Sequence, residues 1–111
     1  MKIAVSSTGK NLSSQVDEIF GRCPYFLIVE IDDKKVKGFE AIENKSANQM
    51  SGAGISAAQM VAEKNVSVVI TGAIGPRGLG VLKQFNIQVY SGAGLVKEVI
   101  QKFIEGKLEK V

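Results

Sequence analysis

The stretch "VSVVITGAIGP" (66–76) carries the pattern that decides the fold. Its first part, 66–71, is an apolar, β-branched run, which is typical of a strand buried on both faces of a sheet. A glycine turn at 72–75 follows at once, and Pro76 suits the first position of a helix over 77–85. A buried strand that leads directly into a helix is the repeating unit of an α/β fold.

The flanking segments predict three strands before this unit and a further helix on each side of it. The three strands are "KIAVS" (2–6), "YFLIVEID" (25–32) and "KVKGFEAIEN" (35–44), and the apolar spacing of the third predicts an irregularity near Gly38. A helix is predicted at 53–64, then, beyond 77–85, a strand at 87–91 and a helix at 95–104. The apolar faces of the three helices consist of Ile55, Ala58, Val61 and Ala62; of Leu79, Leu82 and Phe85; and of Leu95, Val96, Val99, Ile100, Phe103 and Ile104.

The order β-β-β-α-β-α-β-α predicts one α/β domain over residues 1–111, with three layers and a five-stranded mixed sheet between helices. This is a ribonuclease-H-like arrangement. Because crossover connections are right-handed, strands 2–6, 66–71 and 87–91 should be parallel, and strand 25–32 should run against both its neighbours.

Composition excludes several classes of protein. Of the 111 residues, 45% are hydrophobic and 23% charged, as in ordinary globular domains. Lys and Arg exceed Asp and Glu by 14 − 11 = 3, which is too small a surplus to indicate nucleic-acid binding. No apolar run approaches the roughly 18 residues of a membrane span, and the chain turns polar after its first residues, so neither a membrane span nor a signal peptide is expected. A single cysteine excludes an internal disulfide and fits a cytoplasmic location.

The residues that common catalytic sites need are missing. With one Cys and no His, the chain cannot form the common zinc sites or a Ser–His or Cys–His nucleophile. The turn "GAIGPRG" (72–78) lacks the Lys-Ser/Thr of a phosphate-binding loop. Strands 2–6 and 66–71 carry no acidic residue that could hold the two metals of a ribonuclease-H-type nuclease. We therefore expect a protein that is not an enzyme.

The predicted topology gathers several loops at one edge of the sheet. The loops at 6–9, 48–54, 71–76 and 91–94 follow strands that end at this edge, where open α/β sheets bind ligands. Three of these loops lead into helices, whose first N–H groups and positive dipole ends favour an anion. The candidate cofactor-binding residues in these loops are Ser51, Gly52, Gly54, Gly72, Gly75 and Gly92. The alternative is that the glycines only satisfy turn geometry.

Cys23, Arg22 and Arg77 are expected at the same edge. Cys23 precedes strand 25–32, and the adjacent Arg22 would favour its thiolate, the form that binds soft metals and metal–sulfur clusters. Cys23 could instead be a small buried hydrophobic residue. Arg77 lies in the first turn of a helix, where a cation is unfavourable unless an anion lies between it and the helix dipole. Both arginines could also simply be exposed to solvent.

Five blocks of sequence carry a resemblance to a known family. They are "MKIAVSS" (1–7), "FGRCPYFLIVEID" (20–32), "IEN" (42–44), "SGAGISAAQMVAEKNVSVVITGAIGP" (51–76) and "VYSGAG" (89–94). On these blocks the chain resembles the dinitrogenase iron–molybdenum cofactor biosynthesis family, which includes NifX and the C-terminal part of NifB. The resemblance covers nearly the whole chain and implies a ribonuclease-H-like fold.

The resemblance also implies a function. Family members bind or carry iron–sulfur-based cofactors and their precursors without being enzymes, so an iron–sulfur or iron–molybdenum type cluster is the expected ligand. A protein that donates or accepts the cofactor would be its partner. The matching residues are Phe20–Arg22, Cys23, which a subset of members shares, and the turns at 51–54 and 71–76. Many relatives have His where this chain has Ile19, and some have His in the loop that here reads Asn48-Gln49-Met50.

Two functions are therefore expected from the sequence. In the first, the chain binds or carries an anionic metal–sulfur cofactor, with Cys23 as the single protein ligand to metal, Gly21 beside it, and Arg22 and Arg77 balancing the charge. In the second, it is a sensor or adaptor module that binds a phosphate-bearing small molecule, or a protein, with no metal cluster and a structural Cys23. A stand-alone interaction domain without a ligand is a third possibility.

Overall fold

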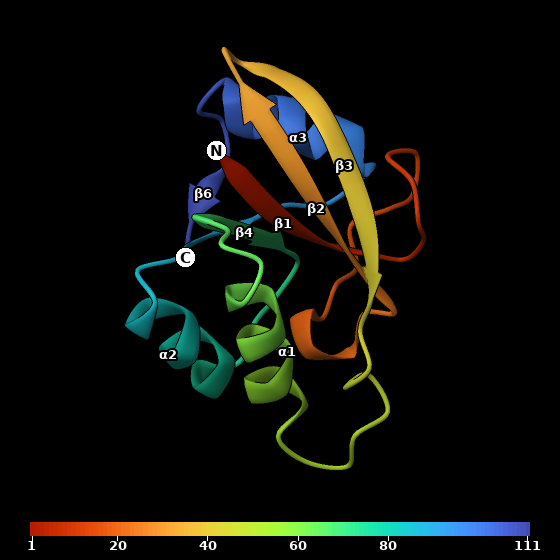
Figure 1. Ribbon diagram of the computed structural model, residues 1–111, viewed down its shortest axis with the longest axis vertical. Helices are drawn as coiled ribbons and strands as arrows, with labels where there is room; N and C mark the ends of the chain where they lie inside the picture. The colour runs from red at the N-terminus through yellow and green to blue at the C-terminus, as the bar shows by residue number, and fades with distance from the viewer.

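The protein forms one mixed β-sheet with helices on both faces (Figure 1). The computed structural model describes all residues, 1–111. The elements are β1 (Lys2–Ser7), η1 (Phe20–Arg22), β2 (Tyr25–Asp32), β3 (Lys35–Glu43), α1 (Ala53–Ala62), β4 (Val68–Thr71), α2 (Pro76–Gln84), β5 (Gln88–Ser91), α3 (Val96–Ile104) and β6 (Glu109–Lys110).

The sheet has six strands in the order β3-β2-β1-β4-β5-β6, so the prediction of five strands is wrong. The first five strands have the predicted directions: β2 runs antiparallel to β1 and β3, and β1, β4 and β5 are parallel. The sixth strand pairs antiparallel with β5 through Glu109 and Lys110. Two exposed charged residues show no strand periodicity in the sequence. They form a strand only because they pair with the free edge of β5. The ribonuclease-H-like designation stays a prediction.

The irregularity predicted near Gly38 is confirmed. The register of β2 against β3 shifts between Glu30, which faces Gly38, and Ile31, which faces Val36. The hairpin turn between these strands has positive φ at Asp33 (51°) and Lys34 (62°), as a type I′ turn in a two-residue hairpin requires.

Each face of the sheet has its own hydrophobic core. Helices α1 and α2 cover one face, where Ala58, Val61 and Leu82 pack, and α3 covers the other face through Val96, Val99 and Ile100. β1 is buried along Ile3–Ser7 because its alternating side chains enter both cores.

Two of the predicted helix faces differ from the structure. Phe85 is 57% exposed because α2 ends at Gln84, so Phe85 lies beyond the helix and outside its apolar face. Ile55 is only partly buried, and Ala53 and Ala57 join Ala58 and Val61 in the core instead. None of the three helices combines the length and hydrophobicity needed to cross a membrane.

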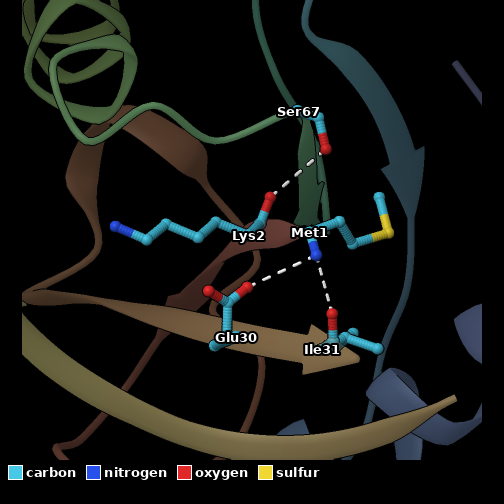
Figure 2. A network of polar contacts seen from close by, with 5 residues as sticks. All are labelled: Met1, Lys2, Glu30, Ile31 and Ser67. Atoms are coloured by element: carbon cyan, nitrogen blue, oxygen red, sulfur yellow. Dashed lines mark hydrogen bonds and ion pairs between the residues drawn. The ribbon is translucent and has the colours of Figure 1, made fainter. Parts of the chain in front are cut away.

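The amino-terminal end of β1 is fastened to both of its neighbours (Figure 2). The Met1 ammonium donates a hydrogen bond to the Ile31 carbonyl at 2.7 Å and pairs with the Glu30 carboxylate at 3.3 Å. On the other side, the backbone N–H and the hydroxyl of Ser67 both donate to the Lys2 carbonyl, at 3.0 and 3.4 Å. These contacts tie the amino-terminal end of β1 to the strands on both sides. The site described below lies at the opposite, carboxyl end of β1 and β4.

Candidate functional site

A hollow of about 350 Å³ lies where η1, the start of α1 and the start of α2 meet. Figure 1 shows η1, in orange, beside the green helix α1. The turn after β4 completes the wall, and the Ile19–Ala73 bridge joins it to the segment before η1. The lining residues are Ile19, Phe20, Gly21, Arg22, Gly52, Ala53, Gly54, Ile55, Ala73, Ile74, Gly75, Pro76, Arg77 and Gly78. This volume falls within the range of small-molecule sites.

Three glycines bring the two helix starts together. A Cβ on Gly21 would lie 2.9 Å from the Gly54 nitrogen, and a Cβ on Gly78 would lie 3.1 Å from the Gly54 oxygen. Side chains at Gly21 or Gly78 would therefore push η1 or α2 away from α1. Their absence lets the N-termini of α1 and α2 open into one hollow.

The backbone of this hollow presents hydrogen-bond donors that no protein group uses. The first N–H groups of α1, at Ala53, Gly54 and Ile55, have no acceptor, nor have those of Arg77 and Gly78 at the start of α2. Neither helix has a side-chain cap or an acidic residue in its first turn. The positive ends of both helix dipoles are therefore uncompensated at the hollow.

The side chains add positive charge and no negative charge. Arg22 and Arg77, the only arginines in the chain, both line the hollow, and none of its lining residues is acidic. The two guanidinium groups differ in their contacts. Nη1 of Arg22 donates to the carbonyls of Ala47, at 3.0 Å, and of Gln49, whereas Arg77 makes no hydrogen bond or ion pair with the protein. The hollow thus has the electrostatic character of an anion site.

Cys23 does not line the hollow. Its side chain is fully buried, and its Sγ donates to the Phe20 carbonyl at 3.2 Å. Burial raises the pKa of the Cys23 thiol to about 12, so the expectation that Arg22 favours a thiolate is wrong. The physical reason is that desolvation outweighs the charge of an exposed guanidinium that is directed to the 45–51 loop. Cys23 is the small buried residue of the alternative interpretation.

Of the ten predicted cofactor-binding residues, six lie together around the hollow. They are Gly21, Arg22, Gly52, Gly54, Gly75 and Arg77. Ser51, Gly72 and Gly92, like Cys23, lie outside its lining.

The glycines outside the lining have other roles. The N–H of Gly72 donates to the Asp17 carbonyl at 3.2 Å, and that of Gly92 donates to the Thr71 carbonyl at 3.1 Å, so neither is free for a ligand. A Cβ on Gly92 would meet Val99 of α3 at 2.7 Å. Its loop turns to the α3 face of the sheet, while the hollow lies on the α1 and α2 face. The 91–94 loop therefore lies at the predicted edge, beside the 71–76 loop, but it does not line the hollow.

Sequence reasoning missed the apolar wall of the hollow and one of its glycines. Ile19, which is 54% exposed, Ile55 and Ile74 form the wall. The sequence contained a signal that could have pointed to Ile19, because this residue directly precedes the Phe20–Arg22 block that matches the family. Gly78 entered the sequence analysis only as the last residue of the turn at 72–78. Its contact with Gly54 joins positions far apart in the sequence, so no local pattern reveals it.

The chain offers no ready set of metal ligands. No group of three or more His, Cys, Asp or Glu side chains lies close enough together to hold a metal ion. Direct coordination of a bare ion does not fit these residues, whereas an anion that brings its own inorganic ligands fits the free N–H groups and arginines.

Fold and site together define a class of small α/β proteins in which two helix N-termini and two arginines converge on one hollow. The family model described as "Dinitrogenase iron-molybdenum cofactor" matches residues 1–106, and the chain belongs to this family. An uncharacterized protein of Methanocaldococcus jannaschii is 41% identical over 111 residues, covering 99% of this chain and 91% of the relative.

Two solved structures share the fold. The apo form of the orange protein from Desulfovibrio gigas superimposes with a TM-score of 0.92 at 33% identity, covering 99% of this chain and 92% of the other. A Thermotoga protein provisionally assigned as NifB has a TM-score of 0.84 at 33% identity, covering 98% and 91% of the two chains.

Proposed function

We propose that the chain binds and carries an anionic metal–sulfur cofactor, or a precursor of one, of the iron–sulfur or molybdenum–iron–sulfur type, and catalyses no reaction itself. The observation that carries the proposal is the hollow lined by Arg22 and Arg77, by the free N–H groups of two helix starts, and by no acidic residue. Membership of the iron–molybdenum cofactor family supports it. So does the likeness to the orange protein, whose apo form is by definition the one without its bound group.

The mode of binding would be through the outer atoms of the cluster. A sulfide-rich cluster carries negative charge on its sulfur atoms, and N–H donors with a positive dipole end stabilise such charge. The apolar wall of Ile19, Ile55 and Ile74 would contact the remaining surface and exclude water, which strengthens each polar contact.

Such a site suits a carrier. With Cys23 buried and protonated, no protein–metal bond would need to break when the cluster leaves. A carrier of this kind requires a protein that donates the cluster and one that accepts it, and a reducing, cytoplasmic location in which a metal–sulfur group persists.

The test is an anaerobic titration of the protein with tetrathiomolybdate, an inorganic molybdenum–sulfur anion, followed by visible absorbance and by metal analysis after gel filtration. We expect a retained chromophore whose affinity falls with salt, because the contacts are charged. Arg77→Gln should weaken binding roughly tenfold or more, as expected for a lost charge-assisted hydrogen bond.

The matched control is Lys83→Gln, which removes one positive charge from the same helix outside the hollow. Equal affinity of the two variants would contradict binding in the hollow, and absence of any retained molybdenum in the parent protein would contradict the proposed ligand class.

A second candidate function is a sensor or adaptor module that binds a phosphate-bearing small molecule in the same hollow. It is favoured by the absence of an accessible thiol or imidazole there, since phosphate needs only N–H donors and cations. Calorimetric titration with a nucleoside triphosphate separates the two functions. Tight binding of the nucleotide together with no retention of tetrathiomolybdate would favour the sensor.

A further inference from the structure

The two arginines of the hollow have different surroundings. Arg77 stands in the first turn of α2 and contacts no hydrogen-bonding group of the protein, whereas Nη1 of Arg22 donates to the carbonyls of Ala47 and Gln49. These two carbonyls belong to the 45–51 loop, the yellow-green loop at the bottom of Figure 1. Arg22 therefore touches both the hollow and a loop outside its lining.

The 45–51 loop has no other hydrogen-bonded tie to the rest of the protein. Its start is anchored by buried Asn44, whose side-chain amide donates to the carbonyls of Gly21, at 3.2 Å, and Cys23, at 2.8 Å. Within the loop, the N–H groups of Ala47 and Gln49 donate to Asn44 and Ser46, and the Gln49 amide donates to Ser51, so these bonds stay inside the 44–51 segment. The bonds from Arg22 alone hold its middle against the body of the protein.

A guanidinium group can hold the loop and an anion at the same time. Arginine has five N–H donors in a planar fork, and the two loop carbonyls need only those on Nη1. The three donors on Nη2 and Nε have no acceptor in the protein. Because Arg22 lines the hollow, these donors are free to bond a ligand there. An anion in the hollow that accepts from these donors fixes the plane of the fork and so lowers the entropy that Arg22 loses when it holds the loop.

We infer that Arg22 is a positioning residue that couples occupancy of the hollow to the order of the 45–51 loop. The inference rests on the proposed function, because it needs an anion in the hollow. Coupling between two sites is reciprocal, so a bound anion holds the loop more firmly and a held loop strengthens anion binding by the same factor. The loop, in which Met50 is 98% exposed, thereby presents a different surface in the loaded and empty protein.

The test measures amide hydrogen exchange in the 45–51 segment, with and without saturating tetrathiomolybdate, in the parent protein, Arg22→Gln and Arg77→Gln. Both variants remove one positive charge from the hollow, but only Arg22→Gln removes the tie to the loop. Without the anion, exchange at Ser46, Ala47 and Gln49 should be roughly fivefold faster or more in Arg22→Gln and unchanged in Arg77→Gln. With the anion, the parent and Arg77→Gln should gain protection in the loop, and Arg22→Gln should gain none.

Two results would overturn the coupling on its own. One is anion-induced protection of the loop in Arg22→Gln; the other is tetrathiomolybdate binding to the parent protein without any change in loop exchange. Failure of the parent to bind the anion would overturn the proposed function and the coupling together. In that case the comparison of variants without anion would still show whether Arg22 holds the loop.

Discussion

The thiol of Cys23 is held in the core between the backbone of Phe20 and the side chain of Asn44. Its Sγ donates to the Phe20 carbonyl, and Asn44 donates to the Cys23 carbonyl, so the thiol and the carbonyl of this residue both have partners within the protein. Ionising this thiol would place a charge in a site that is shielded from solvent. Cys23 therefore stabilises the fold by packing at neutral pH, and in alkaline solution it makes the free energy of unfolding depend on pH.

Alkaline conditions should reduce the stability that Cys23 provides. Up to about pH 9, the ordinary thiol value, both folded and unfolded chains keep the proton, so Cys23 causes no pH dependence. Between pH 9 and about 12 the unfolded chain loses the proton and the folded protein keeps it, so unfolding becomes easier by up to about 1.4 kcal/mol per pH unit. The measurement is urea unfolding of the parent and Cys23→Ala from pH 7 to 11.

The difference in unfolding free energy between the two proteins isolates Cys23, because every other residue is the same in both. This difference should be constant below pH 9 and shrink above it. Parallel curves up to pH 11, or fast modification of the native thiol by a thiol reagent, would contradict the burial of the side chain.

At the scale of elements, the approach of α2 to α1 depends on one glycine of α2. Gly78 faces the Gly54 carbonyl, whereas Gly80, two residues further along the helix, has no atom within 4 Å of where its Cβ would stand. Both lie inside a helix, where glycine is intrinsically unfavourable. The contact of Gly78, and not its conformation, is what an alanine would disturb.

Alanine at the two positions should have opposite effects on stability. Gly80→Ala should raise the free energy of unfolding by about 1 kcal/mol, through helix propensity alone. Gly78→Ala should lower it despite the same gain in propensity, since the new methyl group would lie 3.1 Å from the Gly54 oxygen and force α2 away from α1. Chemical denaturation measures both. Equal stabilisation by the two variants would contradict this prediction, because it would mean that α2 can move away from α1 at no cost in free energy.

At the scale of the whole molecule, two cores share one sheet. The α1 and α2 core and the α3 core lie on opposite faces, and strands β1, β2 and β4 send side chains into both. Loss of either core would leave the other without its sheet, so the two should fold as one cooperative unit.

Substitutions in the two cores should shift one and the same unfolding transition. Val61→Ala and Val99→Ala, one in each core, should each cost roughly 1–3 kcal/mol, and their effects should add because the side chains lie on opposite faces. Far-UV circular dichroism and tyrosine fluorescence, followed during urea unfolding, should give a single coincident transition in every variant. A second transition in Val99→Ala would show that the α3 core unfolds separately.

The sequence alone determined the first five strands and the three helices, their order, and the edge at which most of the site lies. The apolar run at 66–71 and the spacing around Gly38 depend on the chain's own periodicity, and right-handed crossovers then bring Gly54, Gly75 and Arg77 to one edge. These features are local or follow from chirality, so no knowledge of distant neighbours is needed.

Only the tertiary structure decided which residues at that edge face a ligand. The burial of Cys23, the contact of Gly78 with Gly54 and the turn of Gly92 toward α3 each depend on residues far away in the sequence. The same holds for the pairing of Glu109 and Lys110 with β5. Desolvation, steric contact and hydrogen-bond partners are properties of the packed molecule, and a linear pattern does not contain them.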